Sequence, residues 1–351
     1  MLRFSPKLIL LLVALAVFSA HAPANAQTQG KNVVEGSLVN RTDPTIVAAG
    51  TDLEVINLSS GMDIIKTAAT DSQGKFRVEG LPERTPLMLR AVYKGVNYHG
   101  MLSFDAAGLA QAQIEVYEPT TSMKDIQAKS ATLAFQMESD HLHAVETWEI
   151  DNNTNPPRVY IHPEGNFRIS KAPGILEPPK INASAAGAGM PLTQSALESA
   201  DGKSYYSLYP LRPGRTVFEV RQTLPYTDRK YVYAKKFFMD AAELSIGVIP
   251  ADMTLSGDGL VKTETYADEN FAVYSGAAVK AGDEVAWTLS GGTPVVASSD
   301  DEDGDHGGSG TTITAMDGVI GKNALMIGSA LLLVFVAALW IACARLPDRK
   351  S

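Results

Sequence analysis

The sequence predicts an all-β protein, with two consecutive β-sandwich domains followed by one C-terminal transmembrane helix. Short runs rich in Val, Ile, Thr and Tyr recur along the central chain, separated by Gly, Pro, Asn and Asp turn signals. No central stretch keeps a helical period in its apolar residues. A hydrophobic run stands at each end, Leu8–Phe18 and Ala324–Ala344, and the second is long enough to cross a bilayer.

The N-terminal segment has the pattern of an export signal. Arg3 and Lys7 precede the first apolar run, and small residues follow it at Ala24 and Ala26, the positions that signal peptidase requires. The apolar run is too short to span a hydrocarbon layer of ~30 Å. We therefore expect residues 1–26 to be a cleaved signal peptide.

The C-terminal segment has the pattern of a membrane anchor. We expect a transmembrane helix at residues 319–344, because its apolar core contains no charged residue. Lys322 lies on one side of that core, whereas three basic residues follow it in the tail at 345–351. The larger basic cluster marks the cytoplasmic side. The predicted location is the cytoplasmic (inner) membrane, with the N-terminal domains outside and the C-terminus in the cytoplasm.

A low-complexity linker is predicted at residues 293–318. Its centre is rich in Asp, Gly and Ser and has too few apolar residues to build a core. We expect it to hold the preceding domains away from the membrane.

Composition restricts the class of partner. The net charge is −9, which provides no basic surface for nucleic acid. The only cysteine, Cys343, lies in the predicted membrane helix, so the exported region has no disulfide. Exported animal domains of this size usually carry disulfides, and their absence favours a bacterial envelope protein.

Residues 30–118 are predicted to form the first β-sandwich. Its strand candidates often alternate apolar with polar residues, as two sheets that each bury one face require. Turn signals such as Asp43-Pro44 and Lys94-Gly95 separate them. The candidates are Val33–Val39, Asp52–Leu58, Ile64–Ala69, Lys75–Glu79, Leu87–Tyr93, Asn97–Phe104 and Ala112–Tyr117.

This region resembles the carboxypeptidase regulatory-like family, a prealbumin-like sandwich grouped with carbohydrate-binding-like folds. The segments that carry the resemblance are 36–40, 52–55, 70–76 and 80–82. Within the central motif we expect Asp71 and Gly74 to form a tight turn and Phe76 to enter the core. The chain departs from the family at Pro86–Leu89, where a Tyr usually stands. The resemblance implies a fold and an accessory role, and it transfers no catalytic residue.

Residues 119–292 are predicted to form one elaborated β-sandwich, with two small sandwiches as the alternative. The Pro-, Gly- and Ala-rich stretch at 172–195 is expected to be a long irregular crossing, and Leu211–Gly214 resembles a turn of Ig-like domains. The strand candidates are Ala131–Gln136, Ala144–Ile150, Ser204–Tyr209, Thr216–Thr223, Lys230–Tyr233, Glu243–Ile249, Leu260–Thr265, Phe271–Tyr274 and Glu284–Leu289.

Few residues form a pattern that carries chemistry. His141 and His143 are weak candidates for metal ligands, since residues two apart share one face of a strand, and Asp140 and His162 are possible co-ligands. The alternative is a polar strand start with both rings in water. No motif of nucleophilic hydrolysis or phosphate binding is present, so we expect no enzyme activity and no cofactor.

A concentration of tyrosines marks the second region. Tyr205, Tyr206 and Tyr209 are candidate contacts for a ligand or partner, because exposed tyrosine rings stack on sugars and anchor proteins. The alternative is that these rings pack inside the sandwich.

The sequence therefore predicts a non-enzymatic, single-pass envelope protein that presents β-sandwich domains for binding a protein or a glycan. One alternative is an accessory subunit of a membrane complex, in envelope or cytochrome assembly, whose helix makes the contact. A second alternative is an uncharacterised hydrolase.

Overall fold

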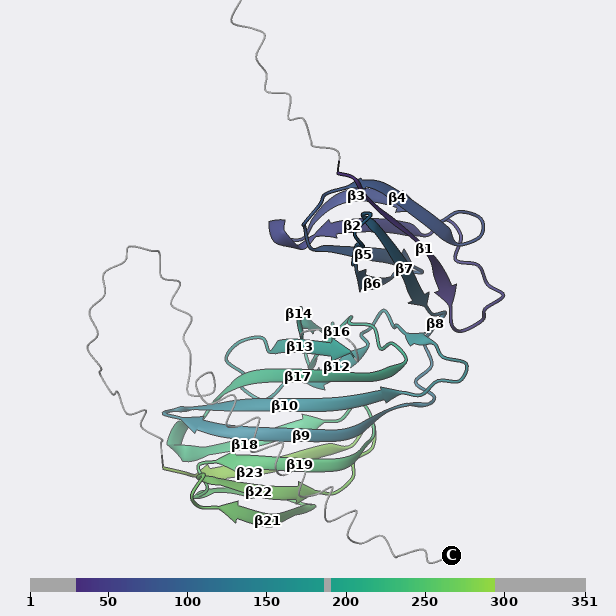
Figure 1. The fold of residues 1–351 in the computed structure, drawn as a ribbon. Coiled ribbons are helices and arrows are strands. Elements are labelled where there is room, and N and C mark those ends of the chain that lie inside the picture. The colour runs from purple at the N-terminus through teal and green to yellow at the C-terminus, as the bar shows by residue number, and fades with distance from the viewer. Residues whose placement is uncertain (1–29, 186–190, 294–351) are drawn as a thin grey trace, which may run out of the picture. The chain divides into compact units, whose positions relative to one another are not determined.

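The computed structural model describes residues 30–185 and 191–293. These residues form an all-β structure of six sheets with two short 3₁₀ turns, η1 (Leu58–Ser60) and η2 (Thr227–Arg229) (Figure 1). None of the helical segments in this described part is long and apolar enough to span a membrane. The predicted signal peptide, the predicted transmembrane helix, the predicted cytoplasmic tail and all but the first residue of the predicted linker lie outside the described residues.

The first β unit contains a three-stranded sheet, β4-β1-β7, and a four-stranded sheet, β3-β2-β5-β6. Both sheets contribute to one core, in which Val34 and Phe76 from the first sheet lie with Leu53 and Leu89 from the second. The strands are β1 (Asn32–Asn40), β2 (Asp52–Asn57), β3 (Asp63–Ala69), β4 (Lys75–Leu81), β5 (Leu87–Tyr93), β6 (Val96–Met101) and β7 (Leu109–Val116). Each of them overlaps a predicted strand.

The turn between β3 and β4 confirms the expected role of Asp71 and Gly74. The Asp71 carboxylate accepts hydrogen bonds from the backbone N–H groups of Gln73 (2.8 Å) and Lys75 (2.9 Å). Gly74 has a φ of +74°, a conformation that glycine adopts without steric cost. Phe76 follows in β4 and is buried, as predicted.

The second β unit is built on a mixed eight-stranded sheet in the order β14-β13-β17-β10-β9-β19-β22-β21. Two three-stranded sheets, β12-β16-β15 and β18-β23-β20, share its core, and its buried apolar residues form one continuous cluster. The strands of the large sheet are β9 (Ile126–Glu138), β10 (His141–Asn152), β13 (Lys180–Ala185), β14 (Leu192–Gln194), β17 (Gly214–Pro225), β19 (Ala241–Ile249), β21 (Leu260–Tyr266) and β22 (Phe271–Gly276).

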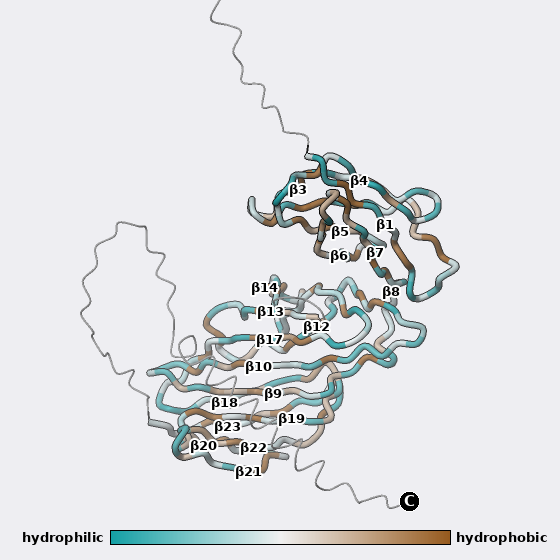
Figure 2. Tube along the Cα trace, in the orientation of Figure 1, coloured by the Kyte–Doolittle hydropathy of each residue, from teal (hydrophilic) through white to brown (hydrophobic). Residues whose placement is uncertain are grey.

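The smaller sheets hold the remaining strands. These are β8 (Pro119–Thr120), β11 (Val159–Tyr160), β12 (Phe167–Ser170), β15 (Leu197–Glu198), β16 (Ser204–Ser207), β18 (Lys230–Lys236), β20 (Met253–Ser256) and β23 (Glu284–Gly291). Alternate residues of β10 are buried, which is the pattern expected of a strand with one face on a core. Figure 2 shows the corresponding change between hydrophilic and hydrophobic colour along the long strands.

One prediction for this unit is wrong. The stretch at 172–195 was expected to be irregular, but it contains β13 and β14, which pair with each other, and β13 also pairs with β17. Ile181 and Ala183 are buried on the inner face of β13. Small residues in this stretch weaken the apolar alternation that identifies a strand, and this is why the sequence did not indicate it.

Candidate binding groove

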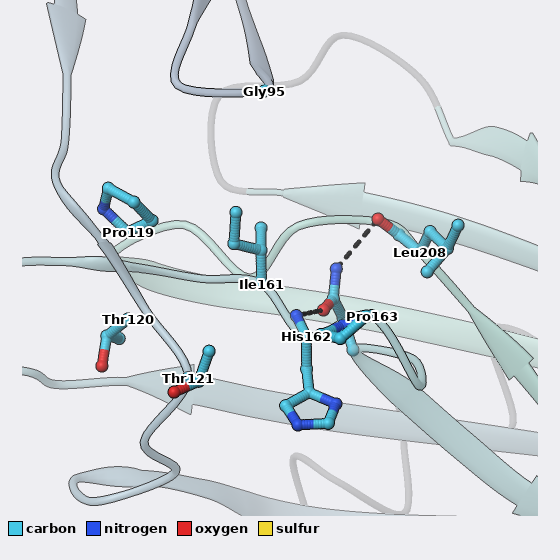
Figure 3. A pocket seen from close by; sticks show the side chains of 9 residues that line it. Gly95, Pro119, Thr120, Thr121, Ile161, His162, Pro163 and Leu208 are labelled. Atoms are coloured by element: carbon cyan, nitrogen blue, oxygen red, sulfur yellow. Dashed lines mark hydrogen bonds between the residues drawn. The ribbon is translucent and has the colours of Figure 1, made fainter.

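An open groove lies beside His162 in the second β unit (Figure 3). Its volume is about 740 Å³. Strand β8 and the segment after β11 supply most of its walls, and Leu208, after β16, and Gly95, between β5 and β6, also line it. The residues of this unit that line it are Pro119, Thr120, Thr121, Ile161, His162, Pro163, Asn166 and Leu208.

Asn166 fixes the shape of the groove. Its side-chain oxygen accepts a hydrogen bond from the His162 N–H (2.6 Å), and its side-chain nitrogen donates to the Leu208 carbonyl (2.9 Å) (Figure 3). The Asn166 side chain is buried, so these two bonds satisfy both of its polar ends away from water. Leu208 is thereby held at the groove with 51% of its surface exposed.

The loop between His162 and Asn166 lies directly over Tyr206. Gly165 has a φ of +111°, and a Cβ atom added there would lie 2.6 Å from the Tyr206 Cβ. No other residue type fits this position without moving the loop or the ring. Gly165 therefore allows the loop that carries His162 to pack closely on β16.

A smaller pocket of about 190 Å³ shares His162 and Asn166 with the groove. Arg168 is the only Arg or Lys among the residues that line it, and Met123, Phe238 and Met239 provide apolar walls. Tyr160 also lines it, and burial raises the pKa of its phenol while the Arg168 charge opposes that rise. The groove and the pocket together offer an apolar surface next to a charged end.

A buried polar cluster lies elsewhere in the same unit, between the large sheet and β18. The Glu146 carboxylate accepts hydrogen bonds from Lys235 (2.6 Å), Tyr233 (2.6 Å), Trp148 (3.0 Å) and Gln222 (3.0 Å). Burial alone raises the pKa of Glu146, but the Lys235 charge and the hydrogen bonds from Lys235, Tyr233 and Trp148 lower the pKa by more, so the net shift is downward. The members are buried, and we assign them a structural role.

The three candidate tyrosines do not lie together at the surface. Tyr205 and Tyr209 are buried in the core of the second unit, where Tyr209 meets Phe218 edge to face at 6.0 Å. Tyr206 is half-buried beneath the loop at Gly165. Only Tyr206 remains close to the groove, so the hypothesis of a three-tyrosine platform is corrected to a core role for the other two.

The candidate metal ligands His141 and His143 lie on β10, away from the groove. His141 contacts Asp140 (2.7 Å) and His143 contacts Glu138 (2.7 Å). No group of three or more His, Cys, Asp or Glu side chains is arranged for a metal ion within residues 30–185 and 191–293. His162, considered as a possible co-ligand, instead lines the groove.

The groove residues Asn166 and Leu208 and the pocket residue Arg168 were not predicted from the sequence. The one local signal was the short polar run from His162 to Gly165, which interrupts the strand pattern between β11 and β12. That run predicts a loop, but it does not indicate which distant residues the loop meets.

Comparisons with known proteins add no functional assignment. No protein-family model matches the chain, and no curated protein is significantly similar to it. The geometry of the groove and the sequence pattern therefore carry the functional argument.

Proposed function

We propose that this protein is a non-enzymatic, single-pass envelope protein that binds an extended segment of a partner protein in the groove beside His162. The observation that carries the proposal is an apolar hollow next to a strand with an open edge. Pro119, Ile161, Pro163 and Leu208 provide the apolar surface.

The open edge belongs to β8. In the part of the chain that the structure describes, β8 has β11 as its only neighbour in the sheet. An extended peptide can pair with such an edge while its side chains enter an adjacent hollow. Since β8 has only two residues and Pro119 has no N–H, the edge offers few backbone hydrogen bonds. The backbone bonds then orient the peptide, and the apolar hollow supplies affinity and selects the side chains.

The chemistry of the lining favours a protein over a glycan. Sugar rings are bound chiefly through exposed aromatic faces, but Tyr205 and Tyr209 are buried and Tyr206 lies under Gly165. The exposed apolar surface consists of Leu208, Ile161 and proline rings. Such aliphatic surface matches the side chains of a polypeptide.

The cellular location of the protein is part of the same proposal. The sequence of the two termini supports export, a C-terminal membrane span and a location of both β units outside the cytoplasm. We further propose that the first unit is a prealbumin-like domain of the carboxypeptidase regulatory-like kind, and that the second is Ig-like. A partner held in this way fits an accessory subunit of a membrane complex as well as a free binding protein.

The proposal is tested by peptide binding to the full chain in detergent. A library of random ten-residue peptides is screened against the wild type, the Leu208→Asp variant and the control Leu192→Asp, which changes an exposed leucine on β14. We expect the wild type and the control to select the same peptides and the Leu208→Asp variant to lose them. Failure to select any peptide, or equal selection by all three proteins, would contradict the proposal.

A further inference from the structure

The pocket beside the groove contains a cation that has no carboxylate partner. Arg168, on β12, forms no ion pair in residues 30–185 and 191–293. Its guanidinium is instead held by two rings, with its Cζ atom 5.4 Å from the Phe238 ring centre and 6.0 Å from that of Tyr206. One of its N–H groups donates to the Glu164 carbonyl (3.0 Å). A guanidinium has five N–H donors, so most of its donors remain available.

Two further donors line the same pocket. The Nδ1 atom of His162 accepts a hydrogen bond from the Glu164 N–H (3.2 Å), and this tautomer leaves the Nε2 atom as a donor. Tyr160 also lines the pocket, and its phenol, like that of any ordinary tyrosine, keeps its proton at neutral pH and can donate. The Glu164 side chain is exposed and forms no ion pair with Arg168. Among the described residues, the pocket therefore contains one free cation, and Glu164 is the only acidic residue of those that line it.

We propose that this pocket binds the C-terminal carboxylate of the partner segment, with Arg168 as its counter-charge. The inference rests on the proposed function, because it places the end of the bound peptide. A carboxylate is planar and accepts two parallel hydrogen bonds from a guanidinium, and a ring-held guanidinium loses little freedom on binding it.

The position of the pocket favours a chain terminus over an acidic side chain. The groove and the pocket share His162 and Asn166, so a peptide that lies along the groove can continue into the pocket. The pocket volume of about 190 Å³ is small compared with the groove. It accommodates the last residue of a chain, and the apolar side chains of Met123 and Met239 surround that residue.

The test uses peptides selected by the full chain in detergent. Each is synthesised twice, once with a free C-terminal carboxylate and once with a C-terminal amide, and its affinity is measured by fluorescence anisotropy. We expect the acids to bind the wild type at least about tenfold more tightly than the amides, the range of a charge-assisted hydrogen bond. The Arg168→Gln variant is expected to bind both forms alike, and Arg168→Lys to retain part of the preference.

The control is Arg221→Gln, which changes an exposed arginine on β17 that pairs with Glu219. It should keep the full preference for acids, and equal unfolding temperatures of all variants would show that folding is intact. If the wild type binds acids and amides equally and Leu208→Asp still weakens peptide binding, this inference is overturned and the proposed function stands. If Leu208→Asp leaves peptide binding unchanged, or if no peptide binds, both this inference and the proposed function are overturned.

Discussion

Glu146 and Lys235 form an ion pair in the interior of the second β unit, with 2.6 Å between Oε2 and Nζ and 1% of each side chain exposed. Glu146 lies on β10 of the eight-stranded sheet and Lys235 on β18 of a three-stranded sheet. The pair therefore connects two sheets across the core. Each charge stabilises the other in the core, because a single buried charge without its partner would lose its hydration and lower the free energy of unfolding.

Removing one member should expose this dependence. In a Lys235→Met variant, Glu146 is left without its counter-charge, and we expect the free energy of unfolding to fall by about 3–5 kcal/mol. Urea denaturation measures the change. Adding Glu146→Gln to Lys235→Met should recover much of the loss, because the uncompensated charge is removed.

The neighbouring Lys236 supplies a matched control. It is exposed and pairs with the exposed Glu284. Lys236→Met should change the free energy of unfolding by no more than about 0.5 kcal/mol. Equal losses in the Lys235 and Lys236 variants would contradict a special role for the buried pair.

Glu146 should also make stability depend on pH. Its pKa in the folded state lies below the ordinary value of 4.5, so its contribution is complete above that value. As pH falls below 4.5, the unfolded chain binds a proton more readily than the folded chain, and the contribution is lost as pH approaches the lower folded-state pKa. Urea denaturation from pH 7 to pH 3 should show a steeper loss for the wild type than for the double variant Glu146→Gln/Lys235→Met, which has neither buried charge. Identical slopes would show that Glu146 does not titrate in this way.

The tyrosines should separate into core and groove residues. Tyr209→Ala removes a buried ring from the contact with Phe218 and should lower the free energy of unfolding by about 3–5 kcal/mol. Tyr206→Ala removes a half-buried ring and should cost less stability but weaken peptide binding, because it loosens the loop at Gly165. Thermal unfolding and anisotropy measure the two effects. The reverse ranking in stability would contradict the assignment of Tyr209 to the core.

Gly165 should be required for the shape of the groove. In Gly165→Ala, the new methyl group meets the Tyr206 ring and the backbone remains in a conformation strained by about 1–3 kcal/mol. We expect weaker peptide binding. The control Gly214→Ala has a comparable positive φ of +93°, but no atom lies within 4 Å of the added carbon. If both variants bind peptide like the wild type, the loop position does not control the groove.

The sequence and the structure agree where the signal is local. The turn at Asp71 and Gly74 was predicted because both residue types have strong turn preferences, and the long strands because their apolar residues alternate. Strands β8 and β11 were not predicted, since two residues give no period.

The groove was not predicted for a different reason. It depends on contacts between segments far apart in the sequence, such as the bond from Asn166 to Leu208. The tyrosines show a related limit. In the run from Tyr205 to Tyr209 both faces of the strand carry apolar or aromatic residues, so alternation does not indicate which face is buried.

The most direct test of the central claim is photo-crosslinking from the groove in the native membrane. A photoreactive phenylalanine derivative replaces Leu208 in the full chain, or Leu192 as the control, and crosslinked products are identified by mass spectrometry. We expect position 208, and not position 192, to capture one protein repeatedly, through a segment that ends at or near its C-terminus. The same set of products from both positions, or none from position 208, would contradict the assignment of the groove as a binding site for a partner protein.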